Sequence, residues 1–301
     1  MRTSRCLLVV FLVLLPTAGA AQLNRSAVSI NGIDTNPCTV ASPCRSFGAA
    51  ASQTNAGGEL VALSSGGYGP FTITQSITVS GAPGVHAALT STGMDGILIN
   101  ATAFDDIVLR NLVLIGTGTG SYGIRAVMAR SLHVERCWIH GFTQDGILST
   151  AKSTQIDDST LQEMPGTAIE ARSQLVGTSI GMRVTNSRID DAGVGILAAT
   201  LSRVVVSNTA IAGSTSGVYV AADANPADML VDRSTMIGNG TGAYATTSGA
   251  GAATLRLSNN TITYNGTGVS ASSATVYSYG NNNIDANSTD LATALTAATQ
   301  Q

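Results

Sequence analysis

Hydrophobic and polar positions alternate in two short motifs that recur along most of the chain. The first motif is a glycine followed by an aliphatic stretch, as in DGILIN around Gly96 and VGILAA around Gly195. The second has aliphatic residues at its first and sixth positions and mostly polar residues between them. Copies of the second motif begin at eight positions spaced 22 to 28 residues apart: Leu109, Val134, Ile156, Val184, Val206, Val231, Leu257 and Tyr279. A period of this length indicates a repeat architecture.

Short strands joined by Gly, Asn and Ser corners explain this repeat. A strand of three to five residues cannot bury an apolar face alone, whereas coils stacked in register bury their inward residues in one column. A propeller blade needs roughly 40 residues, and the leucine spine of a leucine-rich repeat is absent. The sequence therefore predicts an all-β fold, a parallel β-helix solenoid of about ten coils, in which the first and sixth residues of the second motif face inward.

The fourth position of the second motif changes from apolar to small and polar toward the C-terminus. Stacked at a corner, such side chains can bond to one another and to the bending backbone. The sequence therefore predicts an internal ladder, which places Cys137 in the core. Its members are Leu112, Cys137, Ser159, Ser187, Thr209, Ser234, Asn260 and Asn282. By contrast, we attribute the Asn-x-Ser/Thr sequences at Asn24, Asn100, Asn239, Asn259, Asn265 and Asn287 to composition alone.

Both ends of the solenoid are expected to carry caps. A short helix over residues 46–54, stopped by the Gly57-Gly58 pair, would cover strand edges that are otherwise unpaired. At the other end, Leu291 and Leu295 lie four residues apart and predict a second short helix over 290–298, with a frayed tail as the alternative. The predicted organisation is a cap over 21–58, a β-helix over 59–285 and a C-terminal cap or tail over 286–301.

The first twenty residues indicate the compartment. Two arginines precede the aliphatic run CLLVVFLVLL, which is followed by a proline and small residues. This pattern is typical of a secretory signal peptide over 1–20, cleaved after Ala20. Ten apolar residues are too few for the ~20 that span a bilayer, so we expect a secreted or periplasmic protein with no membrane segment after cleavage. In an oxidising compartment Cys38 and Cys44, six residues apart, predict a local disulfide.

The repeated Gly-Ile and Asn-Ser-x-Ile units resemble the right-handed parallel β-helix repeats of the pectate-lyase-like superfamily. The N-terminal block, with its Asn-Gly-x-Asp segment, Pro-Cys pair and later GGYG, resembles the opening of bacterial exported β-helix proteins. The resemblance covers essentially the whole mature chain and implies a right-handed β-helix capped by a short helix. It does not imply one activity, because the superfamily includes lyases, hydrolases and adhesins.

Composition narrows the possible partners. Charged residues make up 11% of the chain, against about 25% in soluble domains, and the net charge is -3. A nucleic-acid-binding surface needs clustered Lys and Arg, so we expect no nucleic-acid partner. Low charge also agrees with a fold in which about half of each strand faces a dry interior.

The resemblance also directs the search for a catalytic centre. Lyases of this superfamily hold Ca²⁺ with acidic residues and use an Arg or Lys base, and its glycoside hydrolases use clustered aspartates. The hydrolase signatures Gly-His-Gly and Arg-x-Lys are absent from this chain. Glu135 and Asp157 share the second, outward position of adjacent repeats, and a coil spacing of about 4.8 Å brings them within range of a carboxylate pair. With His140 and Asp190, they are the candidate catalytic residues.

A second candidate site lies on the next strand. Trp138, the one tryptophan of the chain, alternates outward with His140 and is expected beside Arg188 of a later coil. An exposed indole can stack on a sugar ring, so these three residues form a candidate glycan-binding site. The alternative is that such scattered polar residues only keep the outward positions soluble.

No His, Cys and carboxylate cluster has the spacing of a metal site, so we expect no cofactor, although a weak Ca²⁺ site among surface aspartates stays open. The expected role is a non-enzymatic scaffold or a protein that binds a polysaccharide or cell-surface glycan. The alternative is a polysaccharide lyase or glycoside hydrolase. The sequence does not indicate an oligomeric state.

Overall fold

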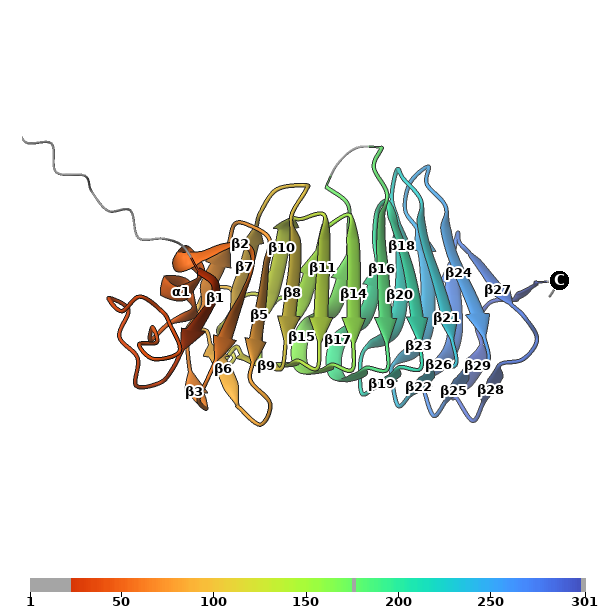
Figure 1. The fold of residues 1–301 in the computed structure, drawn as a ribbon. Helices are drawn as coiled ribbons and strands as arrows, with labels where there is room; N and C mark the ends of the chain where they lie inside the picture. The colour runs from red at the N-terminus through yellow and green to blue at the C-terminus, as the bar shows by residue number, and fades with distance from the viewer. Residues whose placement is uncertain (1–22, 175–176, 299–301) are drawn as a thin grey trace, which may run out of the picture.

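A computed structural model describes residues 23–174 and 177–298, which form a solenoid of parallel strands wound around one axis (Figure 1). The signal peptide expected over 1–20 lies outside the described residues. Sheet A faces the viewer in Figure 1 and contains twelve of the described strands, all parallel to their neighbours. In order along the axis these are β1 (Leu23–Val28), β2 (Thr54–Ala62), β5 (Ile77–Gly81), β8 (Asp106–Arg110), β11 (Ser131–Glu135), β14 (Ser153–Asp157), β16 (Ile180–Thr185), β18 (Ser202–Ser207), β21 (Ala227–Asp232), β24 (Ala253–Ser258), β27 (Thr275–Ser278) and β30 (Thr296–Ala297).

Sheet B contains eighteen of the described strands, arranged in two rows that follow each other along every coil. The first row is β3 (Gly66–Gly67), β6 (Ala87–Thr90), β9 (Leu112–Ile115), β12 (Trp138–His140), β15 (Thr160–Ala171), β17 (Arg188–Ala198), β19 (Ala210–Ala212), β22 (Thr235–Ile237), β25 (Thr261–Thr263) and β28 (Asn283–Asp285). The second row is β4 (Phe71–Ile73), β7 (Ile97–Asn100), β10 (Ile124–Met128), β13 (Ile147–Ser149), the later parts of β15 and β17, β20 (Ser216–Ala222), β23 (Thr241–Thr247), β26 (Thr267–Ser272) and β29 (Thr289–Leu291). Ten strands in each row agree with the expected ten or so coils.

The corner between sheet A and the first row is a sharp bend made by one residue. The third residue of the second motif has a left-handed backbone there, with φ between 48° and 56° in seven consecutive coils. Asn and Asp tolerate this conformation better than most residues, and they occupy five of the seven positions. These residues are Asn111, Arg136, Asp158, Asn186, Asn208, Arg233 and Asn259.

The predicted inward residues form the core. The first residues of seven copies of the second motif, from Leu109 to Leu257, are fully buried. The eighth copy departs from the expectation, because Leu257 pairs with Ser278 and Tyr279 is only half-buried. The last corner is therefore one residue longer than the earlier ones.

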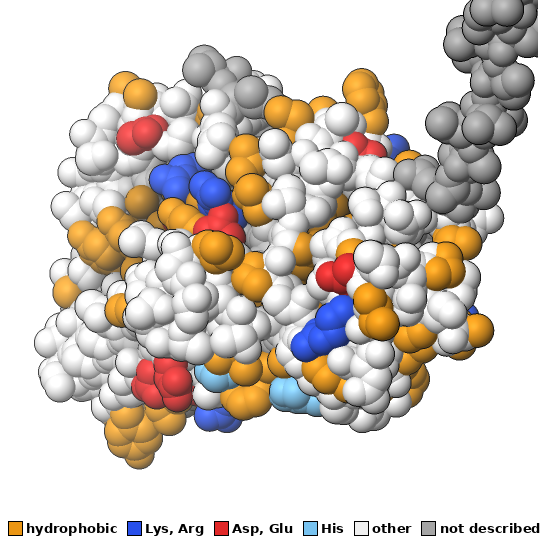
Figure 2. Space-filling model, turned by 90° about the vertical axis from the view of Figure 1, so that its left-hand side faces the viewer, with side chains coloured by type: hydrophobic (Ala, Val, Ile, Leu, Met, Phe, Trp, Pro, Cys, Tyr) orange, Lys and Arg blue, Asp and Glu red, His pale blue; other side chains and the backbone are white. Residues whose placement is uncertain are grey.

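Outward positions carry few charges. Seen from the N-terminal end, most of the surface consists of uncharged polar side chains and backbone (Figure 2). Where Arg or Lys side chains do appear in this view, two groups of them lie directly beside Asp or Glu side chains. Charge on this molecule is thus both sparse and largely paired.

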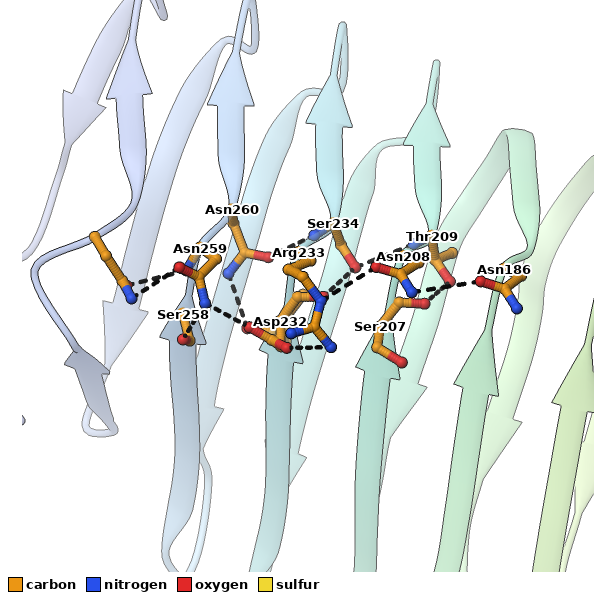
Figure 3. Close-up of polar contacts among 12 residues, drawn as sticks. Asn186, Ser207, Asn208, Thr209, Asp232, Arg233, Ser234, Ser258, Asn259 and Asn260 are labelled. Atoms are coloured by element: carbon orange, nitrogen blue, oxygen red, sulfur yellow. Dashed lines mark hydrogen bonds and ion pairs between the residues drawn. The ribbon is translucent and has the colours of Figure 1, made fainter. Parts of the chain in front are cut away.

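The predicted internal ladder is present. The backbone N–H of Cys137 donates to Ser159 Oγ (3.2 Å), and Cys137 is buried, as expected. Further along, the N–H of Ser234 donates to Asn260 Oδ1 (2.9 Å), and the N–H of Asn260 donates to Asn282 Oδ1 (2.9 Å). Figure 3 shows Thr209, Ser234 and Asn260 of this ladder beside the outward column of Asn186, Asn208, Arg233 and Asn259.

A second internal ladder was not expected. At the corner between the two rows of sheet B, the N–H of Asn239 donates to Asn265 Oδ1 (2.8 Å), and the N–H of Asn265 donates to Asn287 Oδ1 (2.9 Å). Asp290 ends the ladder by accepting from the N–H of Asn287 (3.0 Å). The sequence analysis gave these three asparagines no structural role, whereas their side chains satisfy backbone groups at a corner.

The predicted N-terminal helix is present, but it ends at Gln53, and Gly57 and Gly58 lie within β2 and not at the end of the helix. Helix α1 (Phe47–Gln53) begins after Ser46, whose Oγ accepts from the N–H of Ala49 (3.3 Å). Phe47 is fully buried, and its ring lies 5.0 Å from that of Tyr68. Cys38 and Cys44 form the predicted disulfide. The helix therefore closes the end of the column, and the disulfide braces the loop before it.

The helix predicted over 290–298 is wrong. This segment forms β29 and β30 instead, with Leu291 in register with Val269 and Ala297 with Ser278. The preceding coil presents unpaired backbone groups, which a further strand satisfies more fully than a helix lying across them. In the described part of the chain, no helix is long and apolar enough to cross a membrane.

Candidate functional site

Trp138 lies in a groove at the corner between sheet A and the first row of sheet B. The groove has a volume of about 640 Å³. Its floor is formed by Val113, Trp138 and Thr160 from three successive strands, and residues 82–86 form one wall. The left-handed corner residue Arg136 lies at its rim. The local fold thus places an aromatic side chain between a short loop and a charged edge.

The indole of Trp138 is exposed and held in place. Its side chain is 39% exposed, and its ring stacks on that of His140 with 4.5 Å between centroids and 22° between planes. The two residues alternate outward on β12, as predicted. Figure 2 shows histidine side chains along the lower edge of the molecule, next to a basic and several hydrophobic side chains. This arrangement leaves an aromatic surface available to a ligand.

Arg188 and Asp190 lie two strands beyond Trp138 and His140. Thr160 separates Trp138 from Arg188 in one column, and Gln162 separates His140 from Asp190 in the next. Arg188 forms an ion pair with Asp190 (2.5 Å). The hydrogen bond and the charge of this Asp190 carboxylate raise the pKa of Arg188. The predicted glycan-binding residues therefore share one face, spread over about 10 Å along the axis.

Glu135 and Asp157 are register partners on β11 and β14, as the repeat spacing predicts. Each carboxylate has its own partners, however. Glu135 forms ion pairs with Arg136 (2.8 Å) and with Arg110, whose Nε lies 2.8 Å away but makes no hydrogen bond within the described residues.

Asp157 lies 3.1 Å from His133 Nε2 and accepts a hydrogen bond from Thr185 Oγ1. The four candidate catalytic residues thus divide between two surfaces, with Glu135 and Asp157 on sheet A and His140 and Asp190 on sheet B. The structure does not bring them together around one cleft. A catalytic role for them stays a prediction.

A buried carboxyl pair escaped the sequence analysis. Asp145 lies just before β13, and Glu170 lies on the outward side of the second row, in register with Leu148. Their side chains are hydrogen-bonded to each other, and the residues are 8% and 7% exposed. Arg172 forms an ion pair with Glu170 (3.2 Å).

Burial raises the pKa of Glu170 to about 7, although Arg172 acts in the opposite direction. Burial raises the pKa of Asp145 as well. The available sequence signal was a glutamate at an outward position between Leu148 and Leu197. Because the pair is nearly inaccessible, we interpret it as a structural contact that keeps a proton near neutral pH.

Within the ranges 23–174 and 177–298, no group of three or more His, Cys, Asp or Glu residues is arranged to hold a metal ion.

Comparison with known proteins supports the fold. The family model described as "Right handed beta helix region" matches residues 122–288. A comparison with curated protein sequences finds no significant match. Solved structures with a similar fold include pectate lyase Pel9A, at 16% identity over 87% of this chain and 76% of that chain, with a TM-score of 0.65.

XylC in complex with xylose is similar at 10% identity over 84% of this chain and 68% of that chain, with a TM-score of 0.61. A rhamnogalacturonan lyase is similar at 11% identity over 84% of this chain and 75% of that chain, with a TM-score of 0.56. At these identities the likeness concerns the fold alone. The family match covers more than half of the chain, so this protein belongs to the right-handed β-helix family.

Proposed function

We propose that this protein is an exported, non-enzymatic carbohydrate-binding protein, secreted or periplasmic in a bacterium. The observation that carries the proposal is the exposed indole of Trp138, stacked on His140 at the floor of a groove. Aromatic rings with one polar end are suited to sugars, whose ring faces are apolar and whose hydroxyl groups seek hydrogen bonds. A sugar ring laid on the indole would meet Arg136 at the rim and Thr160 on the floor as hydrogen-bonding groups.

The ion pairs around the groove favour binding over catalysis. General acid–base chemistry on a glycan needs two carboxyl groups directed at one bond, about 5–9.5 Å apart. Glu135 faces two arginines and Asp157 faces His133 and Thr185, so both carboxylates are already engaged. The solved structures of similar fold include a pectate lyase and a protein bound to xylose, which agrees with a carbohydrate ligand.

The binding test compares Trp138→Ala with a matched aromatic control. Phe104→Ala removes another exposed aromatic side chain, 83% exposed, which does not line the groove. Affinities for a panel of neutral and acidic polysaccharides are measured by calorimetry and affinity electrophoresis. We expect Trp138→Ala to weaken binding about tenfold or more, equivalent to about 1.4 kcal/mol, and Phe104→Ala to change it less than twofold.

Three results would overturn this proposal. The first is equal loss of affinity in both variants, and the second is no binding by the unmodified protein. The third is catalysis. Incubation with the same panel, with and without Ca²⁺, followed by ultraviolet absorbance of unsaturated products and by reducing-end release, would reveal a lyase or hydrolase. Activity that disappears in Asp157→Ala would establish the enzyme instead. Export is tested separately by determining the first residue of the secreted chain, which is expected to be Ala21.

A further inference from the structure

Three cations on or directly beside sheet A have no side-chain partner, unlike the other basic residues that the structure describes. The described residues include thirteen lysines and arginines, and nine of the arginines form ion pairs. Arg45 donates to the carbonyl oxygen of Gly67 (2.7 Å). Within the described chain, the side chains of Lys152, Arg183 and Arg203 make neither an ion pair nor a hydrogen bond.

These three exposed side chains lie next to one another in the solenoid. Lys152 directly precedes β14, Arg183 lies on β16 and Arg203 lies on β18, which are consecutive strands of sheet A (Figure 1). Gly181, the register partner of Arg203, has open space where a side chain would project. The chain carries a net charge of -3, so unneutralised positive charge confined to three adjacent coils is a local feature of this face.

A shallow groove of about 350 Å³ extends from this cluster toward the C-terminus. Its floor is apolar, because the outward side chains of Val205 and Leu230 follow Arg183 in one column. The same column continues to Arg256, three strands or about 14 Å from Arg183. Basic groups therefore stand at both ends of an apolar strip.

Arg256 is held in a fixed position at the far end of the groove. Its guanidinium forms an ion pair with Asp228 (3.2 Å) and lies 5.6 Å from the centre of the Tyr277 ring. Asp228 is the register partner of Arg203 in the sheet, but its carboxylate forms its ion pair with Arg256. The groove is thus lined by one acidic group and two basic ones, and Arg183 adjoins it as the register partner of Val205, so the groove keeps an excess of positive charge.

We propose that this face of sheet A binds an anionic polysaccharide, whose carboxylate or sulfate groups pair with Lys152, Arg183 and Arg203 while its sugar rings cover Val205 and Leu230. Guanidinium groups suit these anions because they offer two parallel N–H donors. The apolar strip favours an anionic glycan over nucleic acid, which is usually bound through many phosphates and exposed aromatic platforms. The inference extends the proposed glycan-binding role, but it uses a surface separate from the Trp138 groove.

The test pairs two double variants with the same change in net charge. Arg183→Gln with Arg203→Gln removes the two unpartnered cations at the N-terminal end of the groove. Arg25→Gln with Arg130→Gln removes one cation on this sheet and one directly before it, which already pair with Glu59 and Asp106. Binding is measured by calorimetry at several salt concentrations with a polyuronate, a sulfated polysaccharide, neutral dextran and a DNA duplex.

We expect the groove variant to lose tenfold or more in affinity for the anionic polymer, with a shallower salt dependence, and the control variant to lose less than threefold. The polyuronate and sulfate arms identify which anion is preferred. Arg183 and Arg203 do not line the Trp138 groove, so the Arg183/Arg203 double variant should bind the neutral polysaccharides of the first panel as the unmodified protein does, which separates failure of this inference from failure of the Trp138 groove. Equal losses in both double variants, no binding of either anionic polymer at low salt, equal binding of dextran, or tighter binding of DNA would each overturn the proposal.

Discussion

The internal ladder that contains Asn260 allows a stability prediction whose control residue is the next residue in the chain. Asn260 and Asn259 are neighbours, yet Asn260 is 1% exposed inside the solenoid and Asn259 is exposed on the outside (Figure 3). Both side chains form hydrogen bonds to the adjacent coils. Replacing each of them therefore compares side-chain hydrogen bonds between coils in a buried and in an exposed environment.

The loss of stability in Asn260→Ala follows from the buried backbone groups that lose their hydrogen-bond partner. Asn260 Oδ1 accepts from the N–H of Ser234 (2.9 Å), and its Nδ2 donates to the carbonyl oxygen of Val231 (2.8 Å). Each buried group left unsatisfied costs about 1–3 kcal/mol, so the free energy of unfolding should fall by about 3 kcal/mol. For a chain of this size that lowers Tm by about 6–12 °C.

Asn260→Ser should cost about half as much, because Ser234, Ser187 and Ser159 show that a hydroxyl can occupy this ladder position. Asn259→Gly serves as the control. It removes the bond to Asp232 (2.9 Å), but glycine keeps the left-handed backbone at φ 56°. We expect it to cost less than about 1 kcal/mol, because water replaces the lost bond.

The assay is urea unfolding followed by far-ultraviolet circular dichroism, with unchanged m-values as the check that only stability differs. Equal costs for Asn260→Ala and Asn259→Gly would refute the reasoning, because burial would then have no effect on the value of the bond. A cost below about 1 kcal/mol for Asn260→Ala would refute it as well.

Three further predictions rest on other buried groups. The folded-state pKa of Glu170 is about 7, above its ordinary value of 4.5, so between these values the native state binds more protons than the unfolded state and stability falls as pH rises. Glu170→Gln should therefore reduce the difference between the unfolding free energies measured at pH 5 and at pH 8. An unchanged difference would contradict the assignment. Reduction of the Cys38–Cys44 disulfide should lower the free energy of unfolding by about 2–3 kcal/mol. Reductant should therefore lower the Tm of the unmodified protein but not the Tm of the double variant Cys38→Ser with Cys44→Ser. Burial raises the pKa of Cys137 to about 12, so a thiol reagent should label it only after unfolding, and labelling of the native protein would place it outside the core.

Much of the fold could be predicted because the repeat is local. Alternation within each motif determines which residues face inward. It correctly predicted the burial of Cys137 and of the first residues of seven motif copies, from Leu109 to Leu257. The terminal elements were harder to predict. The Leu291 and Leu295 spacing fits a helix, but the exposed edge of the preceding coil recruits the segment as strands. Similarly, the second motif could not reveal the ladder of Asn239, Asn265 and Asn287, which stacks at a different corner.

The candidate site, too, could be predicted only in part. The repeat spacing correctly placed Glu135 beside Asp157 and alternated Trp138 with His140. It did not reveal that Arg110, Arg136 and His133 would occupy those carboxylates. The Asp145–Glu170 pair and the three unpartnered cations of sheet A were missed for the same reason.

The sequence by itself determined the solenoid, the inward columns, the N-terminal helix and the disulfide, because each depends on residues close together in the chain. Only the tertiary structure decided which charges are neutralised and which remain available to a ligand. Six of the ten ion pairs among the described residues join residues 24 to 34 positions apart, so they depend on corner lengths that set which side chains of successive coils meet.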